Sequence, residues 1–248
     1  MIKPVTTAMV LAAGLGTRMQ PITNTLPKPL VNVGGKALID WVLDDFAASG
    51  ITKAIINVHH LAPFIRSHVA TRTAPQIVIS DETDLLLETG GGIIKALPLL
   101  GTEPFLAANT DAFTVGGSMS AVARLQSSWS ESIDALLLLH PLELTHGFDG
   151  PGDFAMDSQS RLIPRASTLK VPFVYAGIQL LRPEIFKAEK LEPFSMWRIW
   201  QRLMAAGRIA GVVQDGAWFH VGTPEAVVTT DAHLKHMGLA ADTVSSRA

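Results

Sequence analysis

Short apolar runs alternate with amphipathic stretches along the first 141 residues of the chain. The runs are bounded by turn residues and are mostly shorter than a typical helix, which is typical of buried parallel strands. They predict strands at residues 8–13, 54–60, 76–80, 104–111 and 134–141. Between them, apolar residues recur at helical spacing, as at Leu38, Val42 and Phe46. This spacing predicts helices at residues 36–49, 61–72, 90–100 and 118–130.

The alternation predicts an α/β fold with a mostly parallel, doubly wound sheet and a ligand site at the carboxyl ends of its strands. The pattern changes at residues 147–181, where short alternating segments predict a small mixed or antiparallel extension over that site. Another helix, a strand with a turn, and a last helix from Pro224 follow within residues 195–237. No repeat or linker interrupts residues 1–237, so we expect one domain, with residues 238–248 as a frayed tail.

Composition narrows the class of partner. Of the 248 residues, 48% are hydrophobic and 17% are charged, and the net charge is -2. These values fit neither a disordered chain nor a nucleic-acid binder, so we expect small-molecule partners and no nucleic acid. The absence of cysteine excludes disulfides, thiolate metal sites and a cysteine nucleophile. No apolar run reaches the roughly 20 residues that span a bilayer, and the N-terminus is a poor signal peptide, which favours a cytoplasmic protein without a membrane partner.

A glycine-rich loop, LAAGLGTRMQP at residues 11–21, includes the end of the first predicted strand. A dinucleotide-binding loop would need a third glycine where Met19 stands. A P-loop would need Gly-Lys-Ser/Thr, but Gly16 is followed by Thr17 and Arg18. The loop therefore matches neither of these two nucleotide-binding motifs.

The same loop nevertheless has the features of a phosphate site. Small residues at positions 12, 13, 14 and 16 leave backbone N–H groups open to an anion. Arg18 adds a forked cation, and Lys28 stands between two prolines in LPKPL, where the chain is stiff. A tight turn beside surface cations would explain the glycines alone. Glycines, guanidinium and ammonium together favour a triphosphate site.

LAAGLGTRM, PKPL and the order of the later motifs resemble the sugar-1-phosphate nucleotidylyltransferases along nearly the whole chain. The resemblance implies a Rossmann-like α/β domain and a reaction that joins a nucleoside triphosphate to a sugar 1-phosphate and releases pyrophosphate. LLETGGGIIKALPLLG and the short chain most resemble the bacterial members that use UTP and N-acetylmuramate 1-phosphate in cell-wall recycling. Mannose-1-phosphate and heptose-1-phosphate guanylyltransferases carry similar glycine runs and are alternatives.

The resemblance also implies roles for individual residues. Three would be catalytic: Arg18 on the leaving phosphates, Lys28 on the α-phosphate, and Asp111 on Mg²⁺. The nucleotide would be bound by Leu11, Ala12, Ala13, Gly14, Gly16, Thr17, Glu88, Thr89, Gly90 and Gly91. The sugar phosphate would be bound by Asn109, Gly152, Asp153, Tyr175 and Gly177. For Glu88 and Thr89, capping of the following helix is a structural alternative.

One position departs from the family's pattern. The second metal ligand is normally the aspartate of W-x-D-V-G-T, but this chain reads WFHVGT, with His220 in that place. An imidazole is a poorer ligand for Mg²⁺ than for a transition metal such as Mn²⁺. His220 would therefore ligate Mn²⁺, bond a phosphate as imidazolium, or only pack.

Two rival functions follow from the same residues. The altered motif at His220 suggests a non-catalytic nucleotide-sugar sensor. The presence of Arg18, Lys28 and Asp111 argues against it. A nicotinamide oxidoreductase shares the sheet type, but it would need glycine in place of Met19 and an acidic residue at a strand end, whereas Asp40 lies in a helical pattern. Metal-dependent release of pyrophosphate distinguishes the transferase from both.

Overall fold

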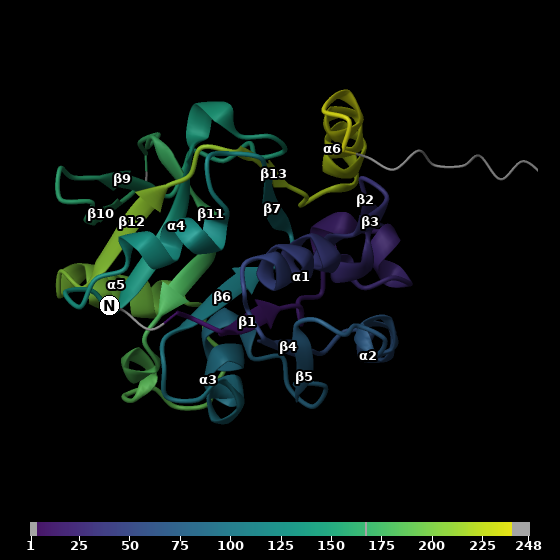
Figure 1. Cartoon of the computed structure of the whole chain (residues 1–248), viewed down its shortest axis with the longest axis horizontal. Coiled ribbons are helices and arrows are strands. Elements are labelled where there is room, and N and C mark those ends of the chain that lie inside the picture. The colour runs from purple at the N-terminus through teal and green to yellow at the C-terminus, as the bar shows by residue number, and fades with distance from the viewer. Residues whose placement is uncertain (1–3, 167, 240–248) are drawn as a thin grey trace, which may run out of the picture.

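The computed structural model describes residues 4–166 and 168–239 of the chain. Nine strands form its central sheet: β1 (Thr7–Leu11), β4 (Lys53–Val58), β5 (Gln76–Asp81), β6 (Phe105–Asn109), β8 (Ala135–Pro141), β9 (Phe154–Met156), β10 (Leu162–Pro164), β11 (Phe173–Leu181) and β12 (Ile209–Val213). The longer strands lie in the order β12, β8, β11, β6, β1, β4 and β5 (Figure 1). The short hairpin β9–β10 is attached beside β11.

All the longer strands except β11 run in the same direction. β11 lies antiparallel between β6 and β8, with a bulge between Tyr175 and Gln179. The mostly parallel α/β sheet is therefore confirmed. In one detail the structure differs: the segment 147–181, assigned to the extension, supplies β11 to the sheet itself. The near-continuous apolar run of β11 fits this position, because a strand inside a sheet covered on both faces is buried on both sides.

Two short ribbons stand beside the main sheet. β7 (Ala112–Val115) pairs antiparallel with β13 (Ala217–His220), and β2 (Asn32–Val33) pairs with β3 (Lys36–Ala37). In the β7–β13 ribbon, His220 lies opposite Ala112, the residue that follows Asp111. The ribbon thus brings the C-terminal part of the chain to the edge at which β6 ends.

Helices cover both faces of the sheet. These helices are α1 (Leu38–Ala48), α2 (Ala62–Val69), α3 (Glu88–Leu100), α4 (Ala121–Ser128) and α5 (Trp197–Ala205), and a further helix, α6 (Pro224–His236), lies beside the sheet. Successive side chains of a strand point to opposite faces, so Val10 packs in the cluster of α1, α2 and α4, whereas Met9 packs in that of α3 and α5. Helix α6 packs through Leu234 on a third cluster that includes Val33 and Phe219. These layers form the doubly wound arrangement expected from the sequence.

The ends of several helices follow from local sequence. Gly50 has a φ of 84° and lies just beyond α1, as its position after the apolar pattern predicts. Pro224 occupies the first turn of α6, and the Thr223 hydroxyl accepts the N–H of Ala226 at 3.2 Å. The proposal of one domain over residues 1–237 stays a prediction. Most of the predicted tail, residues 240–248, lies outside the described residues.

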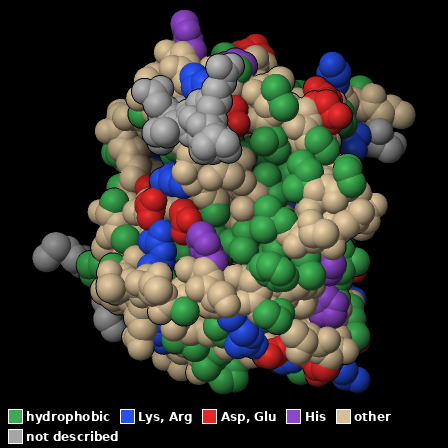
Figure 2. All heavy atoms as spheres, turned by 90° about the vertical axis from the view of Figure 1, so that its right-hand side faces the viewer, with side chains coloured by type: hydrophobic (Ala, Val, Ile, Leu, Met, Phe, Trp, Pro, Cys, Tyr) green, Lys and Arg blue, Asp and Glu red, His purple; other side chains and the backbone are tan. Residues whose placement is uncertain are grey.

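The face that carries α2 and α6 has a mixed charge distribution. Lys36 pairs with Asp44 at 2.8 Å, and Arg72, which follows α2, bridges Asp40 and Asp44 of α1. Figure 2 shows the same mixture, with basic side chains lying beside acidic ones and beside a hydrophobic area. Within residues 4–166 and 168–239, no helix combines the length and the hydrophobicity that a membrane span requires.

Candidate active site

A cavity of about 430 Å³ lies at the carboxyl ends of β1, β4 and β6, where a doubly wound sheet binds its ligands. Its wall joins the glycine-rich loop, the segment around Lys28, the start of α3 and the turn after β6. The lining residues are Leu11, Ala12, Ala13, Gly14, Gly16, Thr17, Arg18, Met19, Lys28, Pro29, Asn57, Leu86, Glu88, Thr89, Asn109, Thr110, Asp111, Ser195 and Gly222.

The glycine-rich loop offers unpaired donors to this cavity. In the described part of the chain, the backbone N–H groups of residues 13–16 have no protein acceptor. Gly16 has a φ of 66°, and a Cβ there would lie 2.9 Å from the Thr23 side chain and 3.1 Å from that of Lys28. The Thr23 hydroxyl donates to the carbonyl of Gly16 at 2.8 Å, which folds the loop back over Lys28. Such a turn with open N–H groups is suited to phosphate oxygens.

Lys28 and Asp111 form an ion pair at one side of the cavity. The Lys28 Nζ donates to Asp111 Oδ2 at 2.8 Å, and the two side chains are 13% and 23% exposed. Pro27 and Pro29 flank the lysine in a short 3₁₀ turn, as its position in the sequence suggested. Burial would raise the pKa of Asp111, but Lys28, His220 and Arg18 together hold this pKa below its usual value. Asp111 is therefore a carboxylate beside the cations of Lys28 and Arg18.

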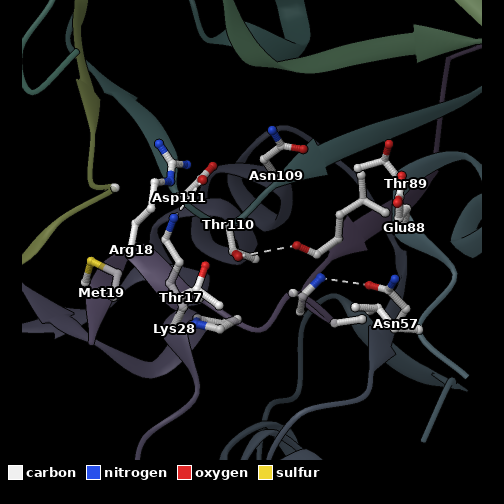
Figure 3. A pocket seen from close by; sticks show the side chains of 18 of the residues that line it. Thr17, Arg18, Met19, Lys28, Asn57, Glu88, Thr89, Asn109, Thr110 and Asp111 are labelled. Carbon is white, nitrogen blue, oxygen red and sulfur yellow. Dashed lines mark hydrogen bonds and ion pairs between the residues drawn. The ribbon is translucent and has the colours of Figure 1, made fainter. Parts of the chain in front are cut away.

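The cations and the first residues of α3 occupy opposite ends of the cavity. Figure 3 shows Arg18, Lys28 and Asp111 gathered at one end, and Glu88 and Thr89 at the other. The Arg18 side chain is exposed, and no hydrogen bond or ion pair holds it among the described residues. It is therefore available for an anion in the cavity.

Glu88 and Thr89 line the cavity, whereas Gly90 and Gly91, which were assigned to the same nucleotide site, do not. Glu88 has a φ of 58°, an uncommon conformation for a residue other than glycine, and such strain is often found at ligand sites. Neither residue caps α3, since the helix has no side-chain cap, and the Thr89 hydroxyl instead accepts the N–H of Met196 at 2.8 Å. Gly90 and Gly91 lie behind them, where a Cβ would contact the loop at residues 192–194.

His220 lies beside Asp111 but outside the cavity wall. Its Nδ1 bonds to the carbonyl of Gly147 at 3.1 Å, and its Nε2 lies 3.8 Å from Asp111 Oδ2. With the proton on Nδ1, the lone pair of Nε2 faces the carboxylate, as it would if both ligated one ion. The rings of Trp218 and Phe148 pack against the imidazole and fix its orientation.

The residues assigned to the sugar phosphate divide into two groups. Asn109 lines the cavity, whereas the other four belong to β11 and to the segment before β9. Asp153 accepts the backbone N–H of Tyr175 at 2.8 Å, and burial raises its pKa. The Tyr175 hydroxyl is buried without a partner among the described residues. At Gly152 and Gly177, both with positive φ, a Cβ would lie 2.4 Å from the Val171 carbonyl oxygen and 3.1 Å from the Ala112 Cβ, respectively.

Several lining residues were not expected from the sequence. The sequence predicted Asn57 only as part of a strand. A signal was present, because Asn57 is the polar residue in the apolar run AIINV, and a buried polar side chain needs a hydrogen-bond partner. Thr110, Ser195 and Gly222 also line the cavity. Ser195 and Gly222 come from segments distant in sequence, and no local pattern places them at the site.

The chain belongs to the nucleotidyl transferase family, whose model matches residues 7–149, more than half of the chain. It is therefore an enzyme, and the sensor and oxidoreductase hypotheses are not supported. It is 42% identical to an N-acetylmuramate α-1-phosphate uridylyltransferase of Caulobacter vibrioides over 92% of this chain and 96% of the relative. A protein of the same name from Neisseria meningitidis is 37% identical over 87% of this chain and 93% of that relative. A putative glucose-1-phosphate thymidylyltransferase of Bacillus anthracis has the same fold, with a TM-score of 0.78 at 17% identity over 92% and 94% of the chains.

Proposed function

We propose that the enzyme transfers a uridylyl group from UTP to N-acetylmuramate 1-phosphate, releasing pyrophosphate. The observation that carries the proposal is the arrangement of Arg18, Lys28 and Asp111 at one end of a cavity whose N–H groups are open to phosphate. The choice of UTP and of this sugar rests on the relatives at 42% and 37% identity, which bear that name. A location in the cytoplasm stays a prediction from the sequence.

The reaction needs positioning and charge neutralisation rather than a protein nucleophile. An oxygen of the sugar phosphate attacks the α-phosphorus, the bond from that phosphorus to the β-phosphate oxygen breaks, and pyrophosphate carries the electron pair away. Lys28 neutralises the charge that develops at the α-phosphate, and Arg18 stabilises the leaving pyrophosphate. The N–H groups of residues 13–16 hold the phosphates. The strand ends hold these groups in place, so little rearrangement is required.

A divalent cation is part of this proposal, because the family generally depends on one. Within the described residues no group of three or more acidic, histidine or cysteine side chains could hold a metal ion. One carboxylate still fits Mg²⁺, which is commonly bound by one or two carboxylates together with substrate phosphates and water. Asp111 would be that ligand, and His220 would add a nitrogen donor better suited to Mn²⁺. When bound, the cation would supply charge neutralisation at the phosphates.

The His220→Asp variant tests the role of this position. A second carboxylate beside Asp111 favours Mg²⁺ over Mn²⁺, so we expect the ratio of the rate with Mg²⁺ to the rate with Mn²⁺ to rise about tenfold. The measurement is pyrophosphate release at saturating substrates with each ion. His233→Asp, on helix α6, is the matched control. An unchanged ratio in His220→Asp would show that this position does not contact the ion.

Competition between substrates tests the proposed specificity. We expect a mixture of UTP and GTP with N-acetylmuramate 1-phosphate and mannose 1-phosphate to give UDP-N-acetylmuramate as the main product, identified by mass spectrometry. Discrimination of about a hundredfold is expected if the site bonds to groups that the competitor lacks. GDP-mannose as the main product would instead support the guanylyltransferase alternative.

A further inference from the structure

A buried amide in the cavity wall and a buried carboxylate behind it join two segments that line the cavity. Asn57, at the end of β4, is 2% exposed, and Glu82, just after β5, is completely buried. The Asn57 Nδ2 donates to Glu82 Oε1 at 2.8 Å. Two buried polar side chains that bond each other usually serve further partners, because unpaired polar groups are costly inside a protein.

The partner of Asn57 on one side is the glycine-rich loop. The N–H of Ala12 donates to Asn57 Oδ1 at 2.7 Å, as Figure 3 shows. The preceding carbonyl, that of Leu11, accepts the Thr110 hydroxyl at 3.4 Å. The peptide between Leu11 and Ala12 is thus held on both sides, and the open N–H groups of residues 13–16 begin at the next position.

The partner of Glu82 on the other side is the start of α3. Its Oε2 accepts the N–H of Leu87 at 3.2 Å, next to the cavity residues Leu86 and Glu88. Hydrogen bonds also fix the backbone of Glu82. Its N–H donates to the carbonyl of Val58 at 2.8 Å, and its carbonyl accepts a bond from the His59 Nδ1 at 2.6 Å. Burial raises the pKa of Glu82, and the N–H donor at each carboxylate oxygen opposes that rise by stabilising the ionised form.

Space around the pair is also restricted. Gly92 of α3 lies against it, and a Cβ there would be 2.8 Å from Glu82 Oε1 and 2.9 Å from Asn57 Nδ2. Glycine inside a helix is destabilising relative to alanine, so a functional or packing reason is expected for it. Close approach of α3 to the Asn57–Glu82 pair supplies that reason.

We propose that Asn57 and Glu82 are positioning residues that hold the glycine-rich loop and the start of α3 at a fixed separation, so that the cavity is preorganised for the nucleotide. The role concerns nucleotide affinity rather than the chemical step, because neither side chain lies among the cations around Asp111. Preorganisation improves affinity by removing the cost of ordering the two segments on binding. The inference rests on the proposed function in one respect, that a nucleoside triphosphate occupies the cavity.

Exchange of the two functional groups tests this role. Asn57→Asp places two carboxylates against each other, and Glu82→Gln leaves one of the N–H donors without an acceptor. The double variant Asn57→Asp/Glu82→Gln restores the chain of bonds with reversed polarity. The carboxylate introduced at position 57 would accept from both Ala12 and the amide introduced at position 82, whose oxygen would accept from Leu87. The net charge of the pair is unchanged.

We expect each single variant to bind UTP about tenfold more weakly by calorimetry, and the double variant to return to within about threefold of the wild type. KM for UTP should rise while KM for the sugar phosphate stays unchanged. Gly92→Ala should also weaken UTP binding, although alanine favours the helix. Single variants that lose thermal stability but keep wild-type UTP affinity would overturn the proposal, as would a folded double variant that binds no better than the single ones. A wild type that binds neither UTP nor GTP would refute the proposed function instead.

Discussion

The Lys28→Met variant is expected to lose about a thousandfold in kcat, the upper range for removing one group that stabilises developing charge. Lys28 is the cation bonded to Asp111 at 2.8 Å, and no other lysine lines the cavity in the described part of the chain. The loss of unfolding free energy should be smaller, about 1–3 kcal/mol, because the Asp111 carboxylate is left partly accessible to water. Pyrophosphate release and urea unfolding measure the two effects.

Lys36→Met is the matched control for this variant. Lys36 also pairs with an aspartate, Asp44, at 2.8 Å, but this pair lies on α1 and the β2–β3 ribbon, away from the cavity. We expect kcat within about twofold of the wild type, since exposed ion pairs contribute little. Equal losses of kcat in Lys28→Met and Lys36→Met would contradict the assigned role.

The Lys28→Met variant should also differ from the wild type in how its stability depends on pH. In the native protein the pKa of Asp111 is below its usual value, so this carboxylate stabilises the fold above the usual carboxyl pKa and the contribution is lost as the pH falls. Without Lys28 the pKa rises. The difference in unfolding free energy between Lys28→Met and the wild type should therefore be full near neutral pH and shrink as the pH falls through about 4 and below.

The Asp111→Asn variant has the second large expected effect. The asparagine is nearly isosteric with Asp111 but has no charge, and it removes the one carboxylate that fits the divalent cation of the proposal. We expect a loss of about a hundredfold to a thousandfold in kcat, with a higher concentration of Mg²⁺ needed for half-maximal rate. Asp44→Asn is the control on α1. A variant with wild-type kcat and wild-type dependence on Mg²⁺ would exclude Asp111 as the ligand.

The elements that the sequence predicted well are those whose signal is local. Buried parallel strands such as β1 and β4 are short, mostly apolar runs, and α1 has a clear apolar face. The two-residue strands β2 and β3 are too short to show any alternation. The sequence did not predict β7 either, because its partner strand β13 lies at the far end of the chain. Pairing between distant segments leaves no local pattern.

In the candidate site, too, the residues that the sequence predicted are those with a local signal. The glycine-rich loop, Arg18 and Lys28 lie within one short stretch, and the structure brings them to a single cavity together with Asp111. The position of His220 beside Asp111 depends on the register of β13 against β7. The pair Asn57 and Glu82 depends on the adjacent ends of two parallel strands. These contacts follow from tertiary structure and could not be predicted from spacing.

The most direct test of the central claim is pyrophosphate release by the wild-type enzyme with UTP, N-acetylmuramate 1-phosphate and Mg²⁺, compared with the Lys28→Met variant. We expect one pyrophosphate for each UDP-N-acetylmuramate formed by the wild type, no release when the sugar phosphate is omitted, and a rate about a thousandfold lower without the Lys28 ammonium. Release that does not require a sugar 1-phosphate, or a rate that does not depend on Lys28, would exclude the proposed transfer reaction.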